Sequence, residues 1–213
     1  MKYDITLKTG VIIENCQKKL AEFCQKDASY RRYDLPPDVK EDNELIEKDI
    51  QFANRMVARM GPLIVKSVVD RSKAINSALA RIVPGISICD ASIPWVALEQ
   101  LFNVTLGPQV GPARVTKILH KKRPKLIPIL DSVVVSYCKV ACSDDLRSKD
   151  TAPSMIAYVK VIKNDINKNL DVLEGVIQAS ALKLTVVRAF DILLWAYSGE
   201  YEATFGNPPV WQR

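Results

Sequence analysis

Apolar residues recur every three or four positions along most of the chain, which is the spacing of one face of an α-helix. In residues 12–26, for example, Cys16, Leu20 and Phe23 fall along one side. The same period predicts helices over residues 41–60, 63–82 and about 92–102. Further helices are predicted from about residue 112, after residue 131, and over 151–169, 170–180 and 182–197. The pattern is that of an all-α protein with eight or nine helices.

Proline and polar residues mark the breaks between these helices. Residues 27–40 are predicted to form a loop, because Pro36 and Pro37 cannot continue a helix. The YRRY run at residues 30–33 either contacts a ligand or packs as part of a surface loop. The lead-in ITLKTGVI is either a small hairpin or irregular, and the tail after residue 197 is predicted to be irregular.

Length and composition bound the class of protein. A chain of 213 residues with 48% apolar residues and a net charge of +6 can bury a substantial core, as one domain or two small lobes. No apolar run approaches the roughly 20 residues of a membrane helix, and the first residues do not resemble a secretory signal. We therefore expect a cytoplasmic protein that does not engage a membrane.

Metal and cofactor sites have little support in the sequence. Five cysteines occur without a CxxC pair, and His120 is the single histidine. Free, buried thiols are the expected state of the cysteines. We expect no metal and no cofactor.

Basic residues are concentrated in one stretch. No acidic residue occurs between Gln100 and Leu130. The cations of this stretch are Arg114, Lys117, Lys121, Lys122, Arg123 and Lys125. Such a concentration favours contact with the phosphates of a nucleic acid. A solvated loop, or a site for a protein or RNA partner, is the alternative.

The same stretch contains a predicted helical hairpin. A helix ends near Phe102, a turn with Gly107 and Gly111 reverses the chain, and a second helix begins near Pro112. The backbone amides at the start of that second helix, from Gly111 to Ala113, are predicted to bind phosphate.

Two short segments carry a resemblance to a known family. Residues 109–115, QVGPARV, resemble the helix-hairpin-helix motif, and residues 128–134, PILDSVV, resemble the segment with the catalytic aspartate of the helix-hairpin-helix DNA glycosylases, the endonuclease III superfamily. Asp131 follows Ala113 by eighteen residues, about the separation that the superfamily uses. The phrase KKRPKLIPILDSVV also resembles an uncharacterised bacterial family.

The resemblance implies a fold and a function. The whole chain, 1–213, would be one two-lobed all-α unit with a cleft between the lobes, and residues 98–142 would hold the hairpin and the catalytic aspartate. The protein would flip a damaged or modified base out of double-stranded DNA and remove it, in repair or in defence against modified foreign DNA. We expect a monomer.

Departures from the motif refine this expectation. Bifunctional members carry a lysine where this chain has Ala113, so we expect hydrolysis of the base without a Schiff base or strand cleavage. Gln109 stands where the usual hairpin has its first glycine, and Val133 where many relatives have histidine. The cysteine quartet of an iron–sulfur cluster is missing.

Asp131 has two readings. As a catalyst, its carboxylate would stabilise the positive sugar and direct a water, and its position at a helix N-terminus would favour ionisation. As a structural residue, it would only cap the helix. Trp95 is the candidate for the base pocket, whereas Trp195 is predicted to lie in the core. A non-catalytic helix-hairpin-helix DNA-binding protein is the alternative function.

Overall fold

Helices form most of the chain that the computed structural model describes, namely residues 3–28, 30–35, 40–142 and 151–205. In chain order the elements are β1 (Ile5–Thr6), β2 (Ile12–Ile13), α1 (Cys16–Lys26), the π-helical turn η1 (Tyr30–Asp34), α2 (Glu47–Phe52), the 3₁₀ turn η2 (Ala53–Met56), α3 (Pro62–Val69), α4 (Ser72–Leu79), α5 (Trp95–Thr105), α6 (Pro112–Leu119), the 3₁₀ turn η3 (His120–Lys122), α7 (Ser132–Ala141), α8 (Ala152–Lys168), α9 (Leu170–Ala179) and α10 (Val186–Phe205). The all-α prediction is confirmed. Ten α-helices occur in these residues because the predicted helix 63–82 is divided.

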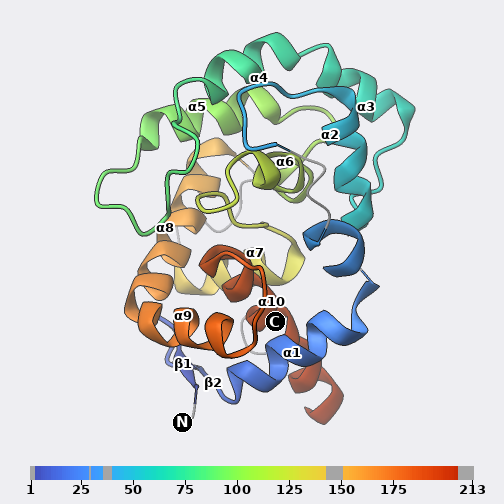
Figure 1. Ribbon diagram of the computed structural model, residues 1–213. Coiled ribbons are helices and arrows are strands. Elements are labelled where there is room, and N and C mark those ends of the chain that lie inside the picture. Colours follow the sequence, from blue (N-terminus) through green and yellow to red (C-terminus); the bar gives the residue numbers. More distant parts are fainter. Residues whose placement is uncertain (1–2, 29, 36–39, 143–150, 206–213) are drawn as a thin grey trace.

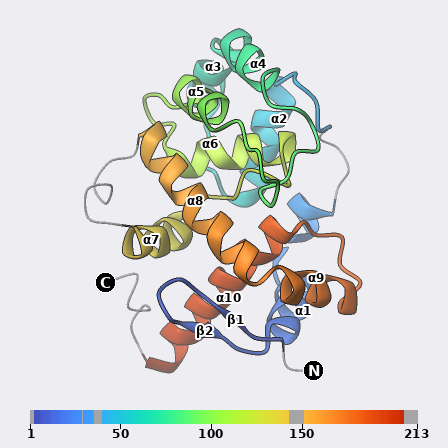
Figure 2. The same ribbon diagram turned by 90° about the vertical axis from the view of Figure 1, so that its left-hand side faces the viewer.

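The helices form two groups along the long axis of the molecule (Figure 1). Helices α2 to α6 lie at one end, and α1, α9, α10 and the β-hairpin lie at the other, with α8 running between the two ends (Figure 2). Helix α8 packs against α5 in one group and α9 in the other. One continuous hydrophobic core joins them, from Ile5 in β1 to Leu101 in α5 and Leu194 in α10.

The N-terminal lead-in is a small antiparallel hairpin. Ile5 pairs with Ile13 and Thr6 with Ile12, and Gly10 takes a φ of 83° in the turn between them. The predicted helix 12–26 therefore begins later, at Cys16. Strand pairing outweighs helical period here, because Ile5 and Ile13 are both fully buried.

Residues 41–60 were predicted to be one helix, and this prediction is wrong at both ends. Only Glu47–Phe52 is α-helical, followed by the 3₁₀ turn Ala53–Met56. Contacts with distant residues hold the preceding segment out of the helix: the Leu45 amide donates to Asn76 Oδ1 at 2.8 Å, and Asp42 accepts from Lys122 at 2.8 Å. Tertiary hydrogen bonds thus replace those of a longer helix.

Most later boundaries agree with the sequence. Helices α6 and α7 begin close to their predicted positions, and α8 and α9 both begin and end close to theirs. Helix α10 begins four residues later than predicted and extends to Phe205, so that the first part of the tail is helical rather than irregular. The predicted loop 27–40 contains the helical turn η1, in which Tyr33 is fully buried. Pro36 and Pro37 of this loop lie outside the described residues, as does Trp211 in the C-terminal tail. No described helix has the length and apolar character that crossing a membrane requires.

Candidate active site

The predicted hairpin between α5 and α6 is present. The amide of Gly107 donates to the Val110 carbonyl oxygen at 3.2 Å, and the amide of Val110 donates back to Gly107 at 2.8 Å. Gln109 takes the left-handed backbone conformation, with φ 62°, that glycine adopts at no steric cost. Gly111 then precedes Pro112, the first residue of α6.

Arg71 fixes this hairpin to α3 and α4. Its guanidinium nitrogen Nη1 donates to the carbonyl oxygens of Thr105 at 2.9 Å and Leu106 at 2.5 Å. A Cβ atom at position 107 would lie 2.7 Å from the same nitrogen. A side chain at position 107 would therefore displace the guanidinium of Arg71 from its contact with the turn.

Asp131 caps α7, as the sequence predicts, and both its carboxylate oxygens have partners. Oδ1 accepts from the amides of Val133 at 3.0 Å and Val134 at 3.1 Å, and Oδ2 accepts from Trp195 Nε1 at 2.5 Å. The side chain is nonetheless at the edge of a cavity, because Asp131 lines it and remains 9% exposed. The residue that caps α7 therefore also lines the cavity.

The ionisation of Asp131 differs from the expectation. Burial raises the pKa of its carboxyl, and the hydrogen bonds from Trp195 and Val134 and the charge of Lys117 oppose that rise without cancelling it. The N-terminal position on α7 was expected to favour the charged form. The hydrogen bonds from the first amides of α7 do lower the pKa of Asp131, but the rise caused by burial is larger.

The cavity beside Asp131 has a volume of about 530 Å³, within the range of small-molecule sites. Segments from both groups of helices contribute to it, including Phe23 near the end of α1, Arg32 in η1, Arg55 in η2 and Lys117 in α6. Helix α10 adds Arg188, Ile192 and Trp195. Aromatic, cationic and acidic groups therefore line one cavity together with Asp131.

Two of the six cations predicted to bind phosphate point inward. Lys122 is 2% exposed, and its Nζ lies 2.8 Å from carboxylate oxygens of both Asp42 and Asp49. Arg123 is fully buried and donates to the Ile82 carbonyl oxygen at 3.0 Å. Carboxylates and carbonyls of the protein occupy the charged groups of these two residues, so their positions give no support to the prediction that they bind DNA.

The cations of α6 mainly hold the loop after η2. Arg114 donates to the carbonyl oxygens of Ala58 at 2.8 Å and Arg59 at 3.0 Å, and Lys117 Nζ donates to that of Met56 at 2.8 Å. Lys117 also lines the Asp131 cavity. Burial lowers its pKa, and the charge of Asp131 opposes this shift.

The remaining predicted contacts are dispersed. Lys121 Nζ lies 4.7 Å from the centre of the Tyr33 ring, a cation–π contact, and Lys125 is exposed. Gly111 and Ala113, at the start of α6, are half-buried. The binding of phosphate by their backbone amides stays a prediction.

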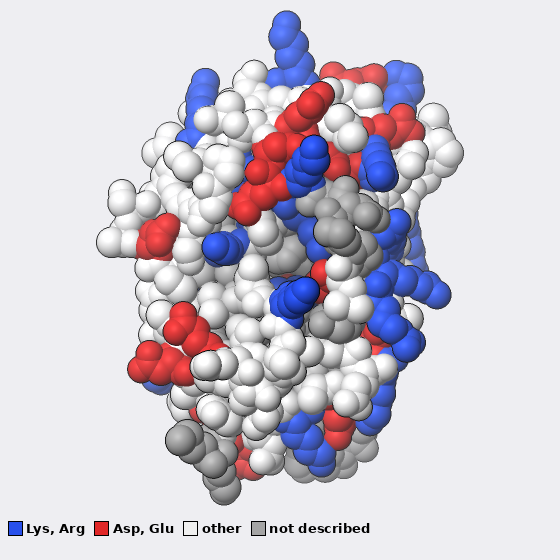
Figure 3. All heavy atoms as spheres, viewed as in Figure 1, with Lys and Arg blue, Asp and Glu red and all other residues white. Residues whose placement is uncertain are grey.

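Figure 3 shows one face of the molecule, on which Lys and Arg follow the right-hand edge and Asp and Glu gather across the upper part.

The core position predicted for Trp195 is wrong, whereas the base-pocket role of Trp95 stays a prediction. Trp95 lines a separate surface hollow, where Lys160 Nζ lies 5.2 Å from its ring centre. Trp195 was predicted to lie in the core, but it is 46% exposed and bonded to Asp131. Arg188, Asp191 and Trp195 share helical spacing in the otherwise apolar first half of α10, and this polar stripe was the signal in the sequence.

A buried ionic network behind Asp131 was also missed. Arg188 forms a two-pronged pair with Asp34, with distances of 2.9 and 3.0 Å, and its Nη1 lies 3.4 Å from Asp191 Oδ2. The same oxygen of Asp191 accepts from the Ile129 amide at 3.3 Å. Because Ile129 is two residues before Asp131, this network fixes the chain that leads into the cap.

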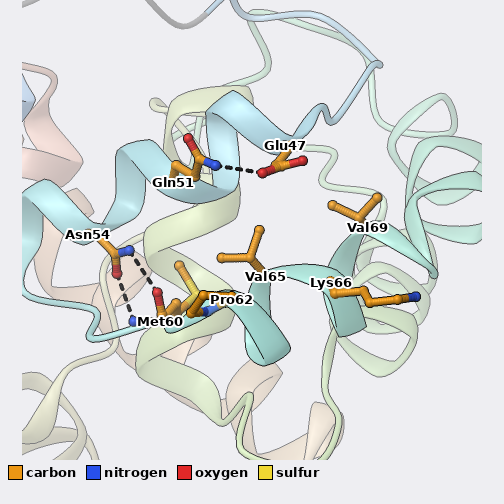
Figure 4. A pocket seen from close by; sticks show the side chains of 8 residues that line it. All are labelled: Glu47, Gln51, Asn54, Met60, Pro62, Val65, Lys66 and Val69. Atoms are coloured by element: carbon orange, nitrogen blue, oxygen red, sulfur yellow. Dashed lines mark hydrogen bonds between the residues drawn. The ribbon is translucent and has the colours of Figure 1, made fainter.

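A second hollow, of about 340 Å³, lies between α2 and α3 (Figure 4). Gln51 donates to Glu47 at 2.6 Å, and the Asn54 amide exchanges hydrogen bonds with the backbone of Met60 at 2.8 and 3.0 Å. These polar groups pair with one another, so the hollow offers fewer groups to a ligand than the Asp131 cavity does.

Metal chemistry has no support in this part of the chain. Among the described residues, no group of three or more His, Cys, Asp and Glu side chains is placed to hold a metal ion. The five cysteines are free thiols, and Cys16, Cys24 and Cys138 are buried.

Comparison with known proteins identifies one family. No curated protein and no solved structure matches the chain. The model of the family described as "Family of unknown function (DUF6308)" matches residues 23–198, which include the hairpin, Asp131 and Trp195. The chain therefore belongs to the DUF6308 family.

Proposed function

We propose that the protein is a monofunctional DNA glycosylase, which flips a damaged or modified base out of double-stranded DNA and removes it by hydrolysis. The observation that carries the proposal is the position of Asp131. Its carboxylate caps α7, lines a cavity of about 530 Å³ and follows the hairpin at the separation used in the helix-hairpin-helix glycosylases. In this proposal the two groups of helices are the two lobes of that fold.

The cavity offers the groups that base removal needs. An extruded base can contact the exposed part of Trp195 and the half-buried ring of Phe23, both of which line the cavity. Cleavage of the bond between the base and C1′ leaves positive charge on the sugar, and the Asp131 carboxylate stabilises this charge and directs a water to C1′. The hydrogen bond from Trp195 keeps the carboxylate fixed during this step.

Hydrolysis without a Schiff base is part of the proposal. Ala113 stands where a lysine nucleophile would be expected from the resemblance, and it has no amine. The product is therefore an abasic site in an intact strand. The enzyme would act as a monomer on cytoplasmic DNA.

A test uses Asp131→Asn in a base-release assay under single-turnover conditions, with duplexes that carry candidate bases. We expect release to fall by at least about 100-fold, because the neutral amide cannot stabilise the sugar cation. Asp90→Asn is the matched control, since Asp90 is exposed and does not line the cavity. Full activity in Asp131→Asn, in a variant that melts cooperatively, would refute the catalytic role.

A non-catalytic DNA-binding protein is the second candidate. The observation in its favour is that both oxygens of Asp131 already have protein partners, which is the arrangement of a structural cap. This candidate predicts binding to every duplex without release of any base. The two functions are separated by measuring binding and base release on the same substrates.

A further inference from the structure

The charges around the Asp131 cavity are unequal. Among the described residues that line it, five are Lys or Arg and two are Asp. The cations are Lys26, Arg32, Arg55, Lys117 and Arg188. Arg188 is paired with the carboxylates of Asp34 and Asp191, and Lys26 with that of Glu22 at 3.3 Å. Among the other lining residues, Arg32, Arg55 and Lys117 are cationic, and Asp27 and Asp131 are acidic.

Lys117 brings this positive charge into the interior of the cavity wall. Its ammonium donates to the Met56 carbonyl oxygen at 2.8 Å, a partner without formal charge. Burial lowers its pKa, which means that the surroundings give the cation less stabilisation than water does. A ligand that brings negative charge or acceptor atoms near Lys117 would supply the missing stabilisation.

The side chains of lysine and arginine donate hydrogen bonds and accept none. A base with several carbonyl oxygens and unprotonated nitrogens on its edge can therefore bind these donors. A base that already carries positive charge, as N-alkylated purines do in DNA, is repelled by the same groups, and it has fewer acceptors to offer.

The bond cleavage that releases the base also favours neutral bases over cationic ones. When a neutral base leaves, the C1′–N bond breaks, both electrons go to the base nitrogen, and the base departs as an anion that the cations stabilise. Water then bonds to C1′ through its oxygen, and its proton ends on the base nitrogen. An N-alkylated base departs as a neutral molecule and gains nothing from the cations at this step.

We propose that the cavity selects neutral bases with acceptor-rich edges, such as deaminated or oxidised bases, and discriminates against cationic alkylated bases. This inference rests on the glycosylase function proposed above and adds the substrate class. The cations of the lining stabilise the leaving base, while Asp131 stabilises the positive charge on the sugar.

The experiment compares duplexes that differ at one nucleotide. Deoxyuridine, deoxyinosine and 8-oxodeoxyguanosine represent the neutral class, and 7-methyldeoxyguanosine and 3-methyldeoxyadenosine the cationic class. Free base is separated by chromatography with enzyme in saturating excess, and each rate is divided by the loss without enzyme. We expect at least one neutral base to be released about 10-fold faster than both cationic ones.

The outcomes separate the two proposals. Preferential release of the cationic bases overturns the substrate class and leaves the glycosylase function standing. Release of no base from any of these duplexes, together with tight binding, overturns the glycosylase function itself and favours the DNA-binding alternative.

Two adjacent arginines provide a matched pair of variants. Arg31 and Arg32 are both exposed, but only Arg32 lines the cavity. Arg32→Met should slow release of the neutral base by about 5-fold at saturating enzyme, whereas Arg31→Met should leave it unchanged. Equal slowing in both variants would overturn the inference, because it would show that the charges act on the DNA backbone rather than on the base.

Discussion

The segment after α6 and the start of α10 make opposite use of their polar residues. Between residues 120 and 125 the cations are dense and conspicuous in the sequence, yet Lys122 and Arg123 are buried against protein partners. Along the first half of α10 the polar residues are few, yet Arg188 and Trp195 reach the Asp131 cavity. Charge density along a chain thus says little about which side a charge faces. Isolated polar positions at helical spacing in an apolar helix are the better guide.

The largest expected effect concerns stability in the segment after α6. Arg123→Met should lower the free energy of unfolding by about 3 kcal/mol or more, because it leaves buried carbonyl oxygens such as that of Ile82 without a donor. Lys125→Met, at an exposed position two residues later, should change it by less than about 0.5 kcal/mol. Urea denaturation of the two variants measures the difference.

Equal behaviour of these two variants would contradict the contrast drawn between buried and exposed cations. The same two variants also distinguish a cation with a structural role from one that contacts DNA. Lys125→Met is expected to reduce the salt dependence of DNA binding, which Arg123→Met should not change while the protein remains folded.

An intermediate effect concerns the start of α10. Trp195→Phe keeps an aromatic ring but removes the N–H that donates to Asp131, so the pKa of Asp131, already raised by burial, should rise further. Since base release needs the carboxylate, the acidic limb of the pH–rate profile should move to higher pH. Trp95→Phe, outside the cavity, should leave the profile unchanged.

The same substitution has a stability consequence with a defined sign. A carboxyl whose pKa is higher in the folded protein than in the unfolded chain destabilises the fold as pH rises through that interval. Trp195→Phe should therefore cost more stability above the pKa of Asp131, by about 2 kcal/mol, than it does at acidic pH. A pH-independent loss in thermal melting would argue that only packing was removed.

The smallest effect lies in the loop that Arg114 and Lys117 hold. Val57 has a φ of 57° and is 63% exposed, an unfavourable conformation for a β-branched residue. Val57→Gly should raise the free energy of unfolding by about 0.5 kcal/mol, after the entropy cost of glycine is subtracted. Val83→Gly, exposed but without a positive φ, should lower it by a similar amount. A loss in both variants would show that Val57 is not strained.

Local signals in the sequence were sufficient for much of the fold. The helices α6 to α9 and the cap at Asp131 follow from periodicity, proline at the first turn and a carboxylate before an apolar run, all of which act within about four residues. The helix predicted over 41–60 was wrong because Asp42 and Leu45 have partners more than thirty residues away. No local pattern reports such contacts.

The candidate site likewise combines features that depend on near neighbours in the sequence with contacts between distant residues. The sequence alone determined the hairpin, the cap and the separation of eighteen residues between Ala113 and Asp131, because each is a property of neighbouring or fixed positions along the chain. Only the tertiary structure decided that Trp195, 64 residues from Asp131, donates to it, and that Arg188 pairs with Asp34 across 154 residues. The physical reason is that hydrogen bonding within a helix depends on near neighbours, whereas burial, pKa and the lining of a cavity depend on which distant surfaces the core brings together.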